Sequence, residues 1–189
     1  YDLAVLALGG ASWKKTGSDG KWMKFLAEAG FKPRQLRAVN SGLEIHWSDY
    51  LKNLVKSDES VKYIKNITLS YKDQKSRGDL VLTEYGVESS PVYAISSDIS
   101  KSLEQQSVQI NLDFLPDQEL EKLSSKLCAR KSKDSLSNFL RKALGLKGIS
   151  FTLLKECHPN LSNHTPAQLA FALKNTPLKI SKTRPMDEA

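Results

Sequence analysis

The sequence predicts an α+β fold, in which a small mixed β-sheet or β-barrel carries an inserted helical subdomain and follows a strand–turn–helix unit. Short segments within residues 36–115 alternate apolar and polar side chains at period two, which is typical of strands. From residue 116 to 175 the apolar residues recur at helical spacing. Residues 176–184 alternate again, so we expect this segment to return to the sheet.

The first 35 residues are expected to form the strand–turn–helix unit. Leu3 to Leu8 form a continuous apolar run that Gly9 and Gly10 end, which favours a buried strand. A strand, a glycine turn and a helix in succession can present backbone N–H groups to a phosphate. The glycines do not have the G-x-G-x-x-G spacing, and no G-K-[ST] sequence of a P-loop occurs. The residues alone therefore do not decide whether this glycine turn contacts a ligand or is only a tight structural turn.

The helix of this unit is predicted from "DGKWMKFLAEAG". Its apolar face would place Trp22 and Phe25 in a core. Asp19 is the expected N-cap, and Gly30 is expected just past the last turn.

The sheet region is expected to contain four strands and at least one helix. The polar segment "KDQKSRG" indicates a hairpin loop that pairs two of the strands antiparallel. Residues 89–106 are typical of a helix, with Pro91 tolerated in its first turn. The segments predicted as strands are 41–47, 63–71, 79–87 and 107–114.

The helical subdomain is expected to contain up to four helices. Gly145 is expected to end the second helix, and Thr165 with Pro166 forms a strong start signal for the fourth. No one of these helices can bury its apolar stripe alone, so we expect them to pack together. The segments are 117–129, 134–145, 149–157 and 165–175.

Composition and chain ends suggest a piece of a larger cytoplasmic protein. The 189 residues are 40% hydrophobic, and their longest apolar run is far too short to span a bilayer. Two cysteines, Cys128 and Cys157, cannot form a disulfide scaffold and fit a reducing cytoplasm. Because the chain begins at Tyr1 without methionine and stops at Ala189 without a tail, we interpret it as part of a longer polypeptide.

The net charge of +7 raises the question of a nucleic-acid partner. Most lysines are scattered, and only residues 129–142 are locally basic. Their one aromatic residue, Phe139, has the spacing of a helix core, so the stacking platforms of single-strand binders are missing. We therefore do not expect nucleic acid as the main partner, but a basic RNA-binding module remains the alternative function.

No metal site and no nucleophile are predicted. Cys157 and His158 are adjacent, which points their side chains apart, and with His164 they still lack a fourth ligand. Cys128 and Cys157 are expected on apolar helix faces, where thiols are usually inert. His46 is interpreted as a surface histidine of a strand.

Four pieces of the sequence resemble, in this order, the central part of a bacterial flavoprotein family: "VLALGGASWKKTGSDG", "YGVESSPVYAIS", "FLRKALGL" and "KISKTRPMDEA". The family is usually described as NAD(P)/FAD-dependent oxidoreductases and includes aminoacetone oxidase. The resemblance covers nearly the whole chain and is nearest to a branch with Trp and Ser-Asp-Gly in the opening turn. In the family, an insert made of a β-barrel and a helical subdomain interrupts a two-part FAD-binding domain.

This resemblance implies a division of the chain. Residues 1–35 would be a remnant of the FAD-binding domain, and residues 185–189 would begin the return to it. Residues 36–115 and 176–184 would form the barrel, and residues 116–175 the helical subdomain. The chain would cover the flavin and shape the substrate pocket, with the rest of the FAD-binding domain as its partner and a small molecule as substrate.

The resemblance also implies the cofactor contacts. FAD would be the cofactor of the full-length protein, with NAD(P)H as a possible co-substrate. The main FAD-binding fingerprint is missing, so this chain alone is not expected to hold FAD or to be active. The residues carried over to the flavin contact are Gly9, Gly10, Ala11, Ser12, Thr16, Gly17, Ser18, Asp19 and Gly20.

Candidates on the substrate side come from "GVESSPVYAIS", which places Ser89, Ser90 and Tyr93 at the start of a helix. The alternative is structural, with Tyr93 in the core and one of the serines as N-cap. No catalytic residue is assigned. If the strand from Leu3 to Leu8 lacks its domain, its exposed edge could let the chain associate with itself.

Overall fold

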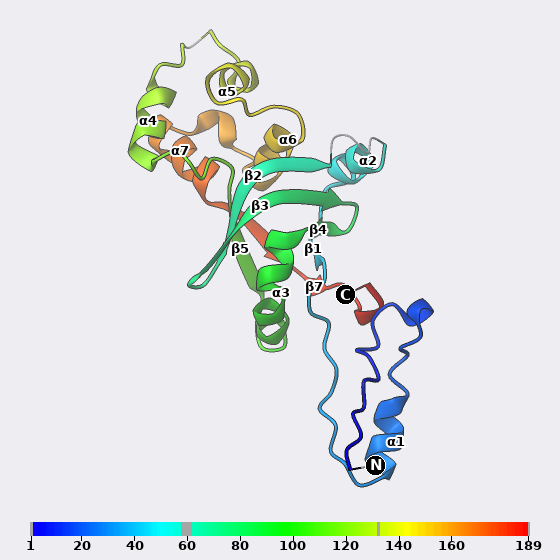
Figure 1. Ribbon diagram of the computed structural model, residues 1–189. Coiled ribbons are helices and arrows are strands. Elements are labelled where there is room, and N and C mark those ends of the chain that lie inside the picture. Colours follow the sequence, from blue (N-terminus) through cyan, green and yellow to red (C-terminus); the bar gives the residue numbers. More distant parts are fainter. Residues whose placement is uncertain (1, 58–61, 132, 189) are drawn as a thin grey trace.

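The computed structural model describes residues 2–57, 62–131 and 133–188, and it confirms the α+β class (Figure 1). The strands are β1 Leu43–Glu44, β2 Tyr63–Tyr71, β3 Gln74–Thr83, β4 Gly86–Glu88, β5 Val108–Asp113, β6 Thr176–Ile180 and β7 Lys182–Thr183. The α-helices are α1 Trp22–Glu28, α2 Asp49–Ser57, α3 Ser90–Leu103, α4 Leu120–Cys128, α5 Leu136–Leu144, α6 Ile149–Cys157 and α7 Pro166–Lys174. Short 3-10 helices are η1 Lys14–Thr16, η3 Leu161–Asn163 and η4 Met186–Glu188.

The strands form one seven-stranded sheet in the order β6-β5-β2-β3-β4-β1-β7. Every strand pair is antiparallel, although the sequence had suggested a mixed sheet. The two end strands, β6 and β7, follow each other in the chain with only Ser181 between them. One segment therefore pairs with β5 through its first half and with β1 through its second half, so the sheet curls round on itself.

The hairpin of β2 and β3 is tighter than the sequence predicted. We expected residues 72–78 to form a loop, but β3 already begins at Gln74, opposite Tyr71. Lys72 takes a positive φ of 52°, which lets two residues reverse the chain. The polar residues of this segment can belong to a strand because none of residues 74–79 is buried. The next predicted strand, 79–87, is correspondingly divided between β3 and β4.

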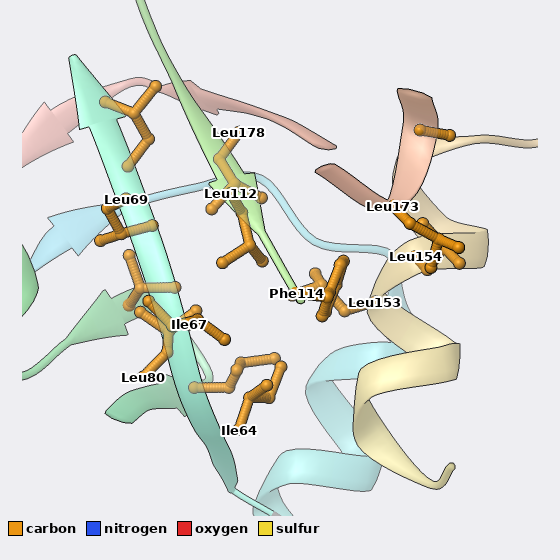
Figure 2. Close-up of a cluster of buried hydrophobic side chains, with 14 of the residues drawn as sticks. Ile64, Ile67, Leu69, Leu80, Leu112, Phe114, Leu153, Leu154, Leu173 and Leu178 are labelled. Atoms are coloured by element: carbon orange, nitrogen blue, oxygen red, sulfur yellow. The ribbon is translucent and has the colours of Figure 1, made fainter. Parts of the chain in front are cut away.

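The core lies between the sheet and the helices that cover it. Leucine and isoleucine side chains from β2, β3 and β5 meet leucines of α6 and α7, with Phe114 at the centre of the view in Figure 2. Helix α3 packs against β3 at Gly78, where an added Cβ would lie 2.7 Å from Cγ of Pro91. Only glycine therefore permits this close approach of helix and strand.

The helical signals of the sequence are confirmed for α3 to α7. Thr165 caps α7 in a capping box, in which its hydroxyl accepts the Gln168 N–H and the Gln168 side chain accepts the Thr165 N–H. Gly145 ends α5 with a φ of 70°. None of the described helices is long and apolar enough to cross a bilayer. Helix α2 was not predicted, although its buried Leu51 and Val55 have the i, i+4 spacing of a helix face.

The N-terminal strand prediction is wrong for this structure. Residues 3–8 are extended but belong to no strand, and Leu3 and Val5 are 82% and 80% exposed. A strand exists only through backbone hydrogen bonds to a neighbouring strand, and within the described residues this segment pairs with no strand. The apolar side chains of this segment are therefore largely exposed.

Helix α1 is also outside the core, so the prediction that Trp22 and Phe25 are core residues is corrected, with Trp22 half-buried and Phe25 exposed. The helix contains no buried residue, and Phe25 is 67% exposed. Asp19 is not the N-cap, because the cap position is Lys21, whose N–H donates to Asp19 Oδ1 at 3.1 Å. The predicted end is confirmed, since Gly30 has a φ of 87° and follows the last turn.

Candidate functional site

The Ser18 hydroxyl joins the two ends of the glycine turn, residues 9–20. Ser18 Oγ accepts the Ala11 N–H at 3.0 Å and donates to the Leu8 carbonyl at 2.9 Å. An added Cβ on Gly9 would lie 2.5 Å from the same oxygen, and one on Gly20 would lie 2.9 Å from Ala11 Cβ. Both glycines also have positive φ angles, so the turn requires glycine at these positions.

The remaining predicted cofactor residues differ in exposure, and Gly10, Thr16, Gly17 and Asp19 are the exposed ones. An added Cβ on Gly10 or Gly17 would meet no heavy atom of the described chain within 4 Å, so other residues do not cover the backbone at these two positions. Ala11 is buried, Ser12 is half-buried, and the Thr16 hydroxyl donates to the Trp13 carbonyl at 2.8 Å. The structure therefore gathers the predicted residues into one ordered turn with an accessible backbone.

The glycine turn lies beside the C-terminal segment. Lys14 Nζ is 3.1 Å from Asp187 Oδ2, an ion pair that joins η1 to η4 across 173 positions of sequence. Figure 1 shows the two short helices next to each other, on the side of the barrel that faces α1. Two of the sequence motifs that carry the family resemblance thus meet in space.

The chain enters and leaves the barrel at one edge, which Arg184 holds together. Its N–H donates to the Gly42 carbonyl at 2.9 Å, and its guanidinium contacts Glu44 at 2.9 Å and Glu188 at 2.6 Å. The guanidinium carbon also lies 4.4 Å from the centre of the Tyr85 ring. Hydrogen bonds to Glu188 and then to Glu44 raise the pKa of Arg184, so its charge is permanent.

Tyr85 links this edge to the start of α3. Its hydroxyl donates to Glu88 Oε2 at 2.5 Å. Burial, with the hydrogen bond to Glu88, raises the pKa of Tyr85 above its ordinary value, so the phenol remains protonated. Burial and the nearby charge of Glu88 also raise the pKa of Tyr93. The sequence interpretation did not identify Tyr85, Glu88 or Arg184, and the only signal for them was their place within two of the resembling motifs.

The three substrate-side candidates do come together at the first turn of α3. The Tyr93 N–H donates to the Ser89 carbonyl at 2.9 Å, and Ser90 is exposed. Ser89 occupies the N-cap position, but its side chain makes no capping bond. Tyr93 is half-buried and packs against the core, which agrees with the structural alternative for this residue.

Ser89 has two unusual features. Its φ of 140° and ψ of 174° belong to a region that is essentially restricted to glycine. Its Oγ is buried without a hydrogen-bond partner among the described residues, as is Oγ of Ser41. Extending the register of Leu43 opposite Val87 places Ser41 opposite Ser89. Two unpaired hydroxyls thus belong to the edge at which the chain enters the barrel.

The cysteines and histidines do not form a site. The described residues contain no group of three potential metal ligands. Burial raises the pKa of Cys157 to about 12, which keeps this thiol protonated and unreactive. Cys128 is exposed, so its predicted place on an apolar face is corrected. Burial lowers the pKa of His158, whose ring stands edge-on to His164 with centroids 6.0 Å apart.

These features define a class of protein, an antiparallel seven-stranded sheet that carries a group of helices and whose incoming and outgoing segments are paired at one edge. Residues 37–189 match the family described as HI0933-like protein barrel and H2TH domain, and the chain belongs to this family. The family description names a barrel and helices, and the structure has a curled antiparallel sheet with helices.

A curated relative is the 3-dehydro-bile acid delta(4,6)-reductase of Clostridium scindens. It is 26% identical to this chain over 200 residues, which cover 100% of the chain and 48% of the relative. The chain therefore spans about half the length of this curated relative, which is named as a reductase.

Proposed function

We propose that this chain is the barrel-and-helix insert of an FAD-dependent oxidoreductase, together with the adjoining parts of its FAD-binding domain. In this role it covers the flavin and shapes the pocket for a small-molecule substrate. The activity belongs to the full-length protein, in which the rest of the FAD-binding domain is the partner of this chain. The name of the related reductase supports redox chemistry.

The observation that carries this proposal is the meeting of the glycine turn with the C-terminal segment. The Lys14 and Asp187 ion pair joins the two parts that the family resemblance assigns to the FAD-binding domain. Beside them, residues 3–8 expose apolar side chains along an extended backbone without a strand partner. An unpaired apolar segment of this kind fits a place in the sheet of a further domain.

The glycine turn has the features that a dinucleotide contact requires. At Gly10 no heavy atom of the described chain would meet an added Cβ, so a ligand can approach the backbone closely. Ser18 fixes the neighbouring backbone before any ligand arrives, which reduces the entropy lost on binding. When bound, FAD would supply the hydride-transfer chemistry, with NAD(P)H as possible co-substrate.

The edge of the barrel would face the substrate. Ser89 and Tyr93 lie at the first turn of α3, next to the carboxylate of Glu88. The protonated phenol of Tyr93 and the unpaired hydroxyl of Ser89 can donate or accept hydrogen bonds from a polar substrate. The role of these residues is therefore to orient the substrate, and Arg184 would hold the edge in position.

An absorbance spectrum tests the flavin assignment directly. The full-length protein, purified without added cofactor, is expected to show the flavin bands in the blue, and this chain alone is expected to lack them. A colourless full-length protein that also fails to bind added FAD would overturn the proposal.

Two glycine variants of the full-length protein make the test specific to the turn. Gly9→Val would force a side chain into the space of Ser18 and should lower flavin content at least tenfold. Gly30→Ala introduces strain at another positive φ without any close contact, and it should retain flavin. Equal flavin in both variants would contradict a contact between the turn and the cofactor.

A further inference from the structure

Much of the net positive charge of the chain comes from one short stretch. Residues 129–147 contain six lysines and arginines and a single acidic residue, Asp134, which gives this stretch a net charge of +5. The net charge of the whole chain is +7. Helix α5 itself has two cations, Arg141 and Lys142, and no acidic residue. This concentration is not explained by the flavin proposal.

These cations form no ion pair with a described residue, and all of them except the half-buried Arg130 are exposed. The exposed cations of the α4–α5 connection and of α5 form no ion pair with any described residue, in contrast to the lysines of α4 and β2 that do. We call the following residues the α5 basic surface: Arg130, Lys131, Lys133, Arg141 and Lys142.

A cavity lies at one border of the α5 basic surface. Arg130 and Lys131 line a cavity of about 260 Å³ together with His164, which precedes α7. The Arg130 Nε–H donates to the Asp134 carbonyl at 3.2 Å, which holds the guanidinium in the loop before α5. Two cations around a cavity of this size suit a phosphate group.

We propose that the α5 basic surface binds the phosphate backbone of double-stranded nucleic acid without reading its base sequence. Charge complementarity carries this assignment, because phosphate contacts by lysine and arginine supply most of the affinity of non-specific binding. Figure 1 shows α5 at the end of the molecule opposite to both termini. The surface therefore stays accessible when a further domain occupies the terminal side, and the proposal does not depend on the flavin assignment.

The side chains around the cations favour a duplex over other polyanions. Within the described part of residues 129–147 no large hydrophobic side chain is strongly exposed, and Phe139 is half-buried against the core. Single-strand binders require exposed aromatic rings for base stacking, and membrane-binding helices require exposed apolar residues that insert into the lipid. Neither is present on this surface.

Fluorescence anisotropy with a labelled duplex of random sequence tests the proposal. The 189-residue chain is titrated against double-stranded RNA, double-stranded DNA, a single strand of the same length and anionic phospholipid vesicles at several salt concentrations. We expect at least one duplex to bind more tightly than the single strand, with log affinity falling by about 0.9 per log unit of salt for each phosphate contact.

A matched pair of triple variants locates the contact. Lys131→Gln, Arg141→Gln and Lys142→Gln together should weaken duplex binding at least tenfold and flatten its salt dependence. The control Lys32→Gln, Lys75→Gln and Lys179→Gln removes the same charge from exposed positions elsewhere and should change affinity less than threefold. Circular dichroism and thermal midpoint confirm that both variants fold.

Three results would overturn the proposal. They are the absence of duplex binding at low salt, equal weakening by the two triple variants, and binding to vesicles in preference to both duplexes.

Discussion

Ser89 combines a strained backbone with a buried hydroxyl that has no partner among the described residues. Such strain costs on the order of 1–3 kcal/mol, and it persists where the surroundings impose it or where function uses it. The barrel edge imposes it here, because Ser89 joins the short strand β4 directly to α3.

Replacing Ser89 by glycine should therefore stabilise the chain. Glycine adopts this φ and ψ without strain and removes the unpaired hydroxyl, while its greater freedom in the unfolded chain costs about 0.5–1 kcal/mol. We expect Ser89→Gly to raise the free energy of unfolding in urea by about 1 kcal/mol. The exposed neighbour provides the control, since Ser90→Gly should lower it by about 0.5–1 kcal/mol. A lower stability of Ser89→Gly than of the natural chain would show that the strain is absent.

At the scale of elements, the barrel edge depends on the closest approach between β1 and β4. Gly86 has a φ of 156°, and an added Cβ would lie 2.0 Å from the Leu43 carbonyl oxygen and 2.8 Å from the Ile45 nitrogen. These contacts are with backbone atoms, which cannot rotate away as a side chain could. The two-residue strand β1 also pairs with β7, so a shift there affects both of its neighbours.

Gly86→Ala should consequently destabilise the chain strongly, by on the order of 3 kcal/mol in urea unfolding. Gly10→Ala is the matched control, because an added Cβ there meets nothing within 4 Å. Its free energy of unfolding should change by less than about 0.5 kcal/mol. Similar stabilities for the two variants would contradict the packing of β4 on β1.

The helical elements show what local sequence can predict. The capping box of Thr165 and the C-terminal Gly145 act within about one helical turn, so their signals lie close together in the sequence. The hairpin was predicted less well, because the start of β3 at Gln74 depends on its pairing with Tyr71 rather than on composition. Helix α2 was not predicted, although Leu51 and Val55 provide a signal of the same local kind.

At the scale of the whole molecule, the exposed segment 3–8 is the feature that most affects behaviour in solution. Its leucines and valine lie on an extended backbone whose N–H and C=O groups have no strand partner among the described residues. Such an edge can pair with a second copy of the chain.

We expect this chain to associate with itself in a concentration-dependent manner in sedimentation velocity. The double variant Leu3→Ser and Val5→Ser should shift the equilibrium towards monomer by at least tenfold, because it removes the apolar area that association would bury. Phe171→Ser, at an exposed position of α7, should leave association unchanged. Monomeric behaviour of the unaltered chain at all concentrations would contradict the prediction.

The candidate site was predictable only in part. The glycine turn and the serines before α3 lie in short recognisable motifs, so the sequence identified them. The Arg184 network could not be identified in the same way, because Arg184 and Glu44 are 140 positions apart and meet only after the barrel has curled. The roles that we propose for these residues depend on the full-length protein.

The sequence by itself determined the α+β class, the helices α3 to α7 and most of the strands, because side-chain periodicity and caps act over a few residues. Tertiary structure decided which strands are neighbours, how one segment supplies both β6 and β7, and which charges remain unpaired around α5. It also decided that residues 3–8 form no strand here. The reason is that pairing and burial require a partner surface, which no local pattern can provide.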